Sequence, residues 1–274
     1  MSESVWRALS DESEQSGDPL STVVDRALST AFDLDRHSLF QVSTSNALVQ
    51  GVFSGAVTVG ELKRNGDFGL GTFDGLDGEL IMLDGVCYRA TAGGAVTSPP
   101  DDARVPFAVV THFRPDLSLA TGPGTLADLT TALDASRPSE NLFVGLRVFG
   151  DFERLSLRAA CAATSGENLL EATAHQSEFT IVQQVGTLVG FWAPLYARAI
   201  NVPGYHFHFI SKDRHVGGHL LDMDADLLES ELHIESELHI AIPETEEFLI
   251  ADLSGDHQEA LHQAETANHT PRPD

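Results

Sequence analysis

The chain has 274 residues, of which 42% are hydrophobic, enough for one large domain or two small ones. It carries 41 acidic and 16 basic residues, a formal net charge of -25, and such a surface repels nucleic acids and anionic membranes. Its only lysines are Lys63 and Lys212. Acid-rich, lysine-poor proteins resemble those of halophiles with a salty interior, which favours adaptation to salt. The alternative, a surface that attracts cations or basic partners, has less support because the acids are spread along the chain.

The N-terminus has no basic start and no apolar run, so we do not expect a secretory signal. No stretch is apolar for long enough to span a bilayer. The two cysteines, Cys87 and Cys161, lie outside any metal-binding spacing, so we expect buried free thiols rather than a disulfide framework. These features together predict a soluble, cytoplasmic protein.

Hydropathy patterns divide the chain into segments. Residues 1–38 are expected to be an acidic, partly disordered extension, mobile over residues 1–18, with a short helix over residues 20–32. The patterns beyond this extension predict helices at 42–52, 58–62, 125–133 and 258–265, and strands at 68–73, 80–83, 86–88, 107–113, 141–149, 155–161, 180–192, 200–210 and 220–223. This mixture indicates an α/β protein with antiparallel or mixed sheet in its C-terminal half.

The sequence ESELHI occurs twice, at residues 229–234 and 235–240. Its six-residue period is even, so the alternation of a strand survives the duplication. We interpret His233 and His239 as strand surface and connection rather than as metal ligands. His215 is expected to lie in an exposed turn.

The segment GYHFHFISKDRHVGGHLLD, residues 204–222, carries the strongest chemical signal. In a strand, His206 and His208 point to one face, while Phe207 and Phe209 point to the other. Residues 211–218 predict a turn, and His219 then opens the returning strand. Three histidines with an open fourth position are typical of catalytic zinc sites. A lone His-x-His is more often packing or surface, and the third histidine raises the odds of a metal.

Several segments in order resemble the α-acetolactate decarboxylase family. Besides the histidine segment they are GDFGLGTFDGLDGE at 66–79, GTLVGFWAP at 186–194 and IPETEEFLIADL at 242–253. The resemblance runs from about Leu39 to about Glu265. It implies two α/β domains, residues 39–137 and 138–254, with the metal site on a β-hairpin of the second. Residues 255–274 would then form a tail that folds back towards the site.

The resemblance also implies an activity. It implies Zn²⁺ held by the three histidines, a homodimer, and 2-acetolactate as the substrate. The reaction expected from this chemistry is decarboxylation to acetoin through an enediolate that the metal stabilises. No organic cofactor is required, because the ketone of the substrate accepts the electrons.

Two further site residues follow from the N-terminal motif. Glu79 corresponds to an active-site glutamate of the family, as proton donor or as partner of the substrate hydroxyl. For a lone glutamate the sequence by itself favours an exposed turn carboxylate. Thr72 matches a threonine that lines the same pocket, and its alternative explanation is β-propensity.

Two residues that are charged at neutral pH are placed by spacing. Arg158 falls where the family has an arginine that can pair with the departing carboxylate, with Arg147 as a competitor. Glu265 lies at about the spacing of a C-terminal glutamate that folds back near the metal, and Glu259 is its alternative.

Two other function classes remain open from the residues alone. A three-histidine metal site also suits a hydrolase, which needs a carboxylate base on a metal-bound water, or an oxygenase, which would use iron. The second class is non-catalytic, a metal-binding or ligand-binding barrel with structural histidines, and a structural metal site is normally closed by a fourth protein ligand. No obvious acid or cysteine beside the histidines supplies that ligand, although the distant Glu265 could.

Overall fold

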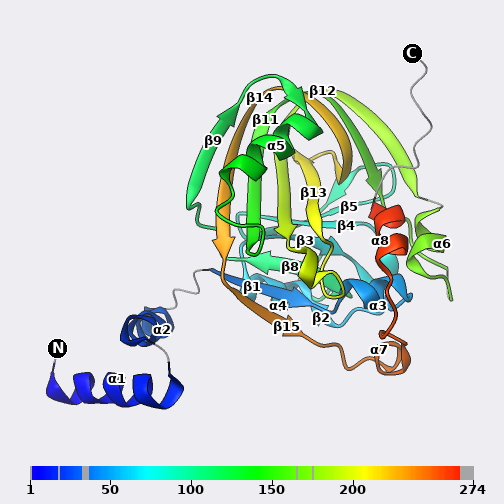
Figure 1. Ribbon diagram of the computed structural model, residues 1–274. Helices are drawn as coiled ribbons and strands as arrows, with labels where there is room; N and C mark the ends of the chain where they lie inside the picture. Colours follow the sequence, from blue (N-terminus) through cyan, green and yellow to red (C-terminus); the bar gives the residue numbers. More distant parts are fainter. Residues whose placement is uncertain (1, 18, 33–36, 165, 175, 266–274) are drawn as a thin grey trace. The chain divides into compact units, whose positions relative to one another are not determined.

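The computed structural model describes residues 2–17, 19–32, 37–164, 166–174 and 176–265 (Figure 1). The chain divides into two compact units, residues 1–36 and 37–274. The first unit contains helices α1, Glu3–Ser16, and α2, Leu20–Phe32. The Ser2 side chain caps the start of α1, and Gly17 ends it in the left-handed conformation. The helix expected at residues 20–32 is confirmed, whereas the mobility of residues 1–18 stays a prediction.

The second unit begins with a seven-stranded sheet. Its strand order is β15-β1-β8-β3-β4-β5-β6, in which β1 and β15 run parallel and the other neighbours antiparallel. The strands are β1 Ser38–Val42, β3 Phe68–Thr72, β4 Glu79–Leu83, β5 Val86–Ala90, β6 Val96–Thr97, β8 Phe107–Thr111 and β15 Glu237–Ala241. β15 comes from far along the chain, so the chain re-enters this sheet after building the second one.

The second sheet contains three very long strands. Its members are β9 Leu117–Thr121, β10 Gly124–Thr125, β11 Phe143–Ala159, β12 Ser177–Ala193, β13 Gly204–Ser211 and β14 Gly217–Glu235. β13 pairs with both β12 and β14, and β11 pairs with both of them as well. These four strands therefore close on themselves, which removes two sheet edges.

The expectation of separate strands at 141–149 and 155–161 is wrong, because β11 is continuous across Gly150. A Cβ on Gly150 would lie 2.4 Å from the carbonyl oxygen of Leu227 on β14. The glycine thus marks a close approach between strands, not a turn. The register between β11 and β14 shifts just after this point, between Asp151 and Phe152.

Short elements complete the unit. They are β2 Val57–Thr58, β7 Arg104–Val105, α3 Ser45–Val49, α4 Val59–Asn65, α5 Leu126–Ser136, α6 Leu169–Thr173, α7 Glu246–Ile250, α8 Gln258–Glu265, and the 3₁₀ turns η1 Asp74–Leu76 and η2 Leu195–Ala197. Capping boxes start α4, from Thr58 and Glu61, and α5, from Thr125 and Asp128. These caps explain why the expected helices near 58 and 125 form where they do.

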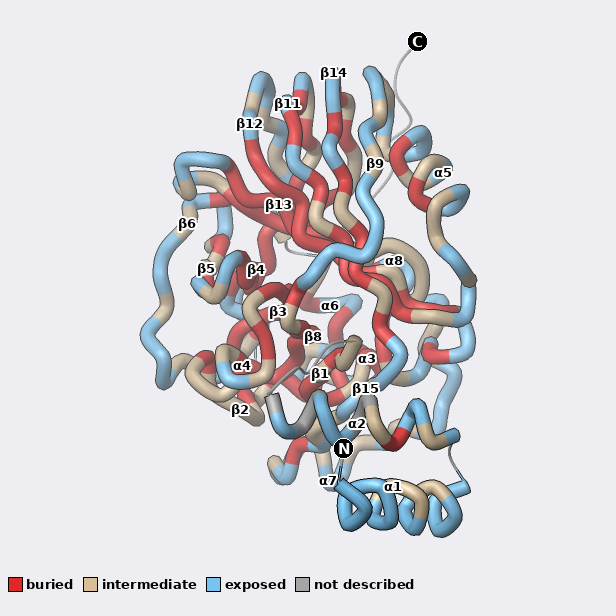
Figure 2. Tube along the Cα trace, turned by 90° about the vertical axis from the view of Figure 1, so that its left-hand side faces the viewer, coloured by how far each residue is buried: buried red, intermediate tan, exposed pale blue. Residues whose placement is uncertain are grey.

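The apolar core lies on both faces of the second sheet. One face packs against the first sheet through residues such as Phe68, Val189 and Phe191, while the other packs against α5 through Leu133 and Phe209. Figure 2 shows buried segments of β11, β12 and β14 at the level of the first sheet, with exposed tips beyond it. The pocket that contains three histidines of residues 204–222 lies between the two sheets, near α8.

The expected mixed α/β class, dominated by sheet, is confirmed. The two-domain layout with a boundary at residues 137 and 138 stays a prediction. β15 follows that boundary in sequence but belongs to the first sheet. No helix in the described ranges is long and apolar enough to cross a membrane. The part of the expected tail beyond residue 265 lies outside the described residues.

Candidate metal centre

The histidine segment folds as the pair β13 and β14, joined by residues 212–216. His208 lies directly opposite His219 in the antiparallel register. Gly217 and Gly218, expected in the turn, instead begin β14. A Cβ on Gly218 would lie 2.7 Å from the carbonyl oxygen of Arg158 on β11, so a larger residue does not fit beside His219. The glycines permit close strand packing at the site.

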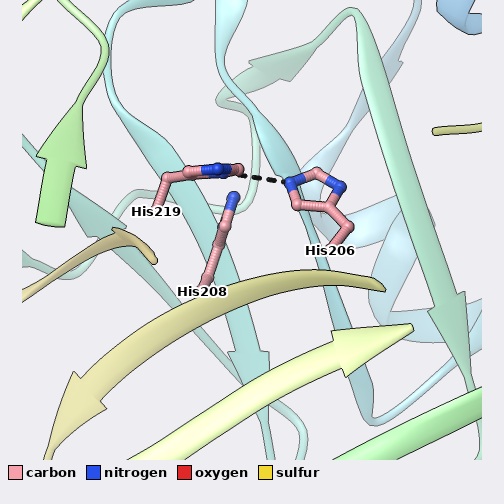
Figure 3. Close-up of side chains that lie close together, drawn as sticks. All are labelled: His206, His208 and His219. Carbon is pink, nitrogen blue, oxygen red and sulfur yellow. Dashed lines mark hydrogen bonds between the residues drawn. The ribbon is translucent and has the colours of Figure 1, made fainter. Parts of the chain in front are cut away.

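Three imidazoles meet on one face of this pair (Figure 3). His206 Nε2 lies 3.2 Å from His219 Nδ1, and one nitrogen of each of the three histidines lies within 4.8 Å of the others. Zinc–nitrogen bonds of about 2.05 Å in a tetrahedron place two ligand nitrogens about 3.3 Å apart. Phe207 and Phe209 pack in the core on the opposite face, as the alternation predicts.

The outer nitrogens of two of these rings have partners that orient them. His208 Nδ1 lies 2.9 Å from the carbonyl oxygen of Leu80, and His219 Nε2 lies 3.3 Å from that of Glu265. Donation to these carbonyls leaves His208 Nε2 and His219 Nδ1 with lone pairs that face the cluster. His208 Nε2 is buried and has no hydrogen-bond partner among the described residues. Such an orphaned acceptor fits a metal ligand.

The three histidines are neutral in this setting. Burial lowers the pKa of His206 and of His208 to about 3, with Arg158 and, for His208, its histidine neighbour acting in the same direction. Burial also lowers the pKa of His219 well below its usual value. Neutral imidazole is the form that binds metal, so the cluster needs no deprotonation near pH 7.

Glu79 and Thr72 face each other across β3 and β4, next to the cluster. Glu79 Oε2 lies 3.5 Å from His208 Nε2, and its Oε1 accepts the backbone N–H of Ala160 at 3.0 Å. Glu79 is buried, so an exposed turn carboxylate is ruled out. Burial raises its pKa to about 7 although Arg158 opposes the shift. Thr72 is buried as well and lines the pocket, donating to the carbonyl of Gly78.

Arg158 and Glu265 complete the ring of polar groups. Arg158 Nη2 lies 3.3 Å from Glu265 Oε2, and another guanidinium nitrogen contacts the Ala264 carbonyl. Glu265 Oε2 lies 3.7 Å from His206 Nε2 and 3.6 Å from His219 Nε2. Arg158 reaches the site from the end of β11, and Glu265 from the end of α8.

The two competing residues lie elsewhere. Arg147 is also on β11, not on a different strand as expected, and it pairs with Asp84 at 2.8 Å. Glu259 is exposed, and its carboxylate faces Gln263 on the same helix. Neither lines the pocket that contains the three histidines.

The walls of that pocket come from segments that sequence reasoning did not connect with the site. Leu48 of α3, Leu76, Phe107, Leu169 of α6 and Val202 form an apolar lining around the polar groups. α8 contacts both α3 and α6, which brings Glu265 over the cluster. No sequence signal pointed to these residues, because each is an ordinary core position in its own element.

The three histidines that the sequence analysis named but did not assign to the metal site differ in burial. His215 and His239 are exposed, with side-chain exposures of 80% and 64%, as expected. The interpretation of His233 as strand surface is wrong, because its side chain is fully buried. It groups with His37 and Asp116 in a second cluster of potential metal ligands, which the sequence analysis missed. These residues are far apart in sequence, and no spacing links them.

The main site can hold a divalent metal through neutral nitrogen donors and bind a small anion beside it. It combines a guanidinium, a carboxyl group with a pKa near neutrality, and an apolar wall. Such groups can orient a carboxylate substrate, move one proton and exclude water.

Comparison with known proteins agrees with this geometry. The family model described as alpha-acetolactate decarboxylase matches residues 39–255. The alpha-acetolactate decarboxylase of Methylococcus capsulatus is 39% identical over 231 residues, covering 84% of this chain and 89% of that protein. That of Methanosarcina mazei is 39% identical over 229 residues, covering 83% and 80%.

A solved structure shares the fold. The crystal structure of alpha-acetolactate decarboxylase from Bacillus subtilis strain 168 matches with a TM-score of 0.82 at 33% identity, over 84% of this chain and 100% of that chain. With a family match across most of its length, the chain belongs to the alpha-acetolactate decarboxylase family.

Proposed function

We propose that this protein is a zinc-dependent decarboxylase that converts 2-acetolactate to acetoin. The observation that carries the proposal is the cluster of His206, His208 and His219, ringed by Arg158, Glu79 and Glu265 within one pocket. Family membership supplies the substrate class. The reaction requires no organic cofactor, because the ketone of the substrate accepts the electron pair of the breaking bond.

The donor set fits zinc. The three rings are neutral, two of them have outer nitrogens with oriented partners, and the 3.2 Å between His206 Nε2 and His219 Nδ1 suits tetrahedral coordination. When bound, Zn²⁺ supplies a fixed positive charge that polarises the ketone and hydroxyl oxygens of the substrate and offsets negative charge developing there. The protein supplies the remaining functions from its own side chains.

Arg158 is the candidate for substrate binding. Its Nε is buried and has no hydrogen-bond partner among the described residues. An unsatisfied buried N–H on a guanidinium favours an anionic ligand, since leaving it unpaired costs about 1–3 kcal/mol. Arg158 therefore holds the carboxylate of 2-acetolactate in the pocket and orients it for departure as CO₂.

Glu79 is the candidate for proton transfer. Burial raises the pKa of Glu79 to about 7 in the metal-free protein, so this carboxyl group holds its proton at higher pH than an exposed glutamate does. A carboxylic acid poised near the working pH is suited to protonate the carbon that loses CO₂. Delivery from one side of the pocket yields one enantiomer of acetoin. Glu265, on the other side, is the candidate partner for the substrate hydroxyl.

A hydrolase or an iron-dependent oxygenase is the alternative use of such a site. Glu265 Oε2, near two of the histidine nitrogens, lies where a hydrolase would place its base. The family match favours the decarboxylase over both alternatives. A homodimer, a cytoplasmic location and adaptation to salt stay predictions.

The deciding experiment measures acetoin formation from racemic 2-acetolactate in molar KCl, after subtraction of spontaneous decarboxylation. Wild type, chelator-treated protein and the His208→Ala variant are compared. Rapid conversion that chelation and mutation both abolish, and that Zn²⁺ restores only in the wild type, supports the proposal. No conversion by folded, zinc-loaded protein would refute it, and iron-dependent oxygen uptake or ester hydrolysis would indicate the alternatives.

A further inference from the structure

A second histidine cluster lies where the chain passes between the two sheets. β14 ends at Glu235 in the six-stranded sheet, and β15 begins at Glu237 in the seven-stranded sheet. The backbone N–H groups of Ser236 and Glu237 both donate to the carbonyl of His37, which precedes β1. Asp116 precedes β9, the other neighbour of β14 at this end. Four strand ends from two sheets therefore meet here, those of β1, β9, β14 and β15.

The side chains at this junction have metal-binding spacing. His233 Nδ1 lies 3.4 Å from Asp116 Oδ2. One donor atom from each of the three residues lies within 4.8 Å of the others. Tetrahedral ligands at about 2.05 Å from a metal are about 3.3 Å apart, so small side-chain movements would complete the geometry.

Buried atoms with incomplete hydrogen bonding supply an independent indication. His233 is fully buried, and neither of its ring nitrogens makes a hydrogen bond of normal geometry among the described residues, although the Arg114 backbone and the Asp116 carboxylate lie beside the ring. Glu235 is fully buried as well, and its carboxylate oxygens make no hydrogen bond of normal geometry among these residues, although the Thr111 side chain lies beside them. Buried polar groups with incomplete hydrogen bonding are costly, so their presence together favours a further component at this junction.

Neighbouring acceptors and donors orient the ligands as in known metal sites. Glu235 Oε1 lies 3.5 Å from His233 Nε2, so it can accept that N–H and leave the Nδ1 lone pair facing Asp116. His37 Nδ1 lies 2.6 Å from the carbonyl of Ile234, which leaves Nε2 as its donor atom. Asp116 Oδ2 accepts the backbone N–H of Ile234 at 2.8 Å. A carboxylate behind a ligating histidine is a common arrangement in zinc proteins.

We propose that His37, Asp116 and His233 form a second site for a divalent transition-metal ion, with Glu235 as the carboxylate that orients His233. Two imidazoles and a carboxylate suit Zn²⁺ or Co²⁺ and not Mg²⁺ or Ca²⁺, which prefer oxygen ligands. His37 and Asp116 are partly exposed, with side-chain exposures of 40% and 32%, so an ion can enter from solvent. The ion stabilises the junction between the two sheets and takes no part in the reaction.

The test is a metal titration of chelator-treated, full-length protein with Co²⁺ and with Zn²⁺. It combines elemental analysis after gel filtration, cobalt absorption, and the thermal unfolding midpoint. The ligand variants are Asp116→Asn and His37→Asn. Asparagine tolerates the left-handed backbone that His37 adopts at φ 68°, so the variant should fold. The control is His239→Asn, because His239 holds the same place in the second ESELHI copy but is exposed.

The expected stoichiometry is two ions per chain in the wild type and in His239→Asn, and one in each ligand variant. The Glu235→Gln variant should bind the second ion about 10- to 100-fold more weakly. Combining Asp116→Asn with His208→Ala should abolish binding, whereas His208→Ala alone should retain one ion, which separates this proposal from that for the catalytic site. Equal metal content in wild type and Asp116→Asn would overturn the proposal and leave the cluster as a network of proton-sharing side chains.

Discussion

The two histidine clusters of this protein use the same side chain in opposite surroundings. His206, His208 and His219 lie in a pocket between the sheets, where each ring is neutral and the carboxylates of Glu79 and Glu265 stand 3.5–3.7 Å from ring nitrogens. At the strand junction, Asp116 is partly exposed, and a carboxylate oxygen of Asp116 is itself one of the three potential metal ligands. The first cluster has space for a ligand beside it, and the second lies among strand ends.

The difference teaches that burial alone does not mark an active site. His233 is as buried as His208, yet only His208 shares a pocket with an arginine and a glutamate of raised pKa. Convergence of an anion-binding group, a proton carrier and an apolar wall distinguishes a reactive site from a structural one.

Loss of a ligand from the first cluster should have the largest effect. We expect His208→Ala to reduce kcat/KM for 2-acetolactate by about 10³-fold, since the metal contributes several kcal/mol and each 1.36 kcal/mol is tenfold. Acetoin assays in zinc-containing buffer check this, with His239→Ala as a control expected to match the wild type. Comparable losses in both variants would erase the distinction between the clusters.

Removal of the proton carrier should have the next largest effect. Glu79→Gln keeps the shape but cannot transfer a proton, so we expect a loss of about 10²-fold in kcat. Burial raises the pKa of Glu79 to about 7 in the metal-free protein, and bound Zn²⁺ would lower it, so with the protonated form required the wild-type rate should fall as pH rises through the pKa of Glu79 in the zinc enzyme. The pH profile of kcat/KM tests both points, and persistence of that limb in Glu79→Gln would assign it to another group.

The first cluster should destabilise the chelator-treated protein in acid. The folded pKa of His206 is lowered to about 3 from 6.5, so its stabilisation is present above 6.5 and is lost as pH falls towards 3. Replacing it in His206→Asn should make the free energy of unfolding less dependent on pH, by on the order of 3 kcal/mol between pH 7 and pH 4. Urea unfolding measures this, with the exposed His215→Asn as control. Parallel curves for wild type and His206→Asn would contradict the prediction.

The second cluster should destabilise the chelator-treated protein at high pH instead of at low pH. Burial raises the pKa of Glu235 to about 8 from 4.5, so its contribution is present below 4.5 and is lost as pH rises through 8. In chelator-treated protein, Glu235→Gln should gain on the order of 4 kcal/mol relative to wild type between pH 5 and pH 9. Glu229→Gln, the equivalent exposed position in the first ESELHI copy, is the matched control. If only the Glu229→Gln control gained stability, the pH dependence would come from surface charge and not from the buried Glu235.

Added salt should have the smallest effect on stability of all these changes. It should act on the charged surface as a whole and not on either cluster. With a net charge of -25, raising KCl from 0.1 to 1 M shortens the Debye length from about 10 Å to about 3 Å and relieves self-repulsion. We expect the thermal midpoint to rise by about 3 °C or more. Calorimetry across this range tests the salt adaptation, and an unchanged midpoint would argue against it.

Alternation and turn chemistry predicted much of the fold. The β13 and β14 pair, with Phe207 and Phe209 on the face opposite the histidines, follows directly from a period of two. Helices near residues 58 and 125 follow from their caps. The break expected at Gly150 failed because a glycine between strands has the same signature as a turn glycine, and only packing against β14 distinguishes them.

Local sequence patterns predicted those site residues that lie close together in the chain. The three histidines lie in one hairpin, so local alternation predicted that they lie close together. Glu79 and Thr72 were placed by the family resemblance, and they lie opposite each other because Thr72 ends β3 and Glu79 begins β4. Arg158 and Glu265 came from the family resemblance and not from periodicity. The structure brings both to the histidines through the end of β11 and the packing of α8 on α3 and α6.

By itself, the sequence determined the class of chemistry: three histidines able to bind a metal, on a strand pair whose alternation places them on one face. Only the tertiary structure decided which copy of ESELHI is buried, because both copies have the same local pattern. His233 is buried where β14 meets β9 and β11, whereas His239 lies on β15, where its side chain is exposed. Local sequence sets which face a side chain takes, and long-range strand pairing decides what covers that face.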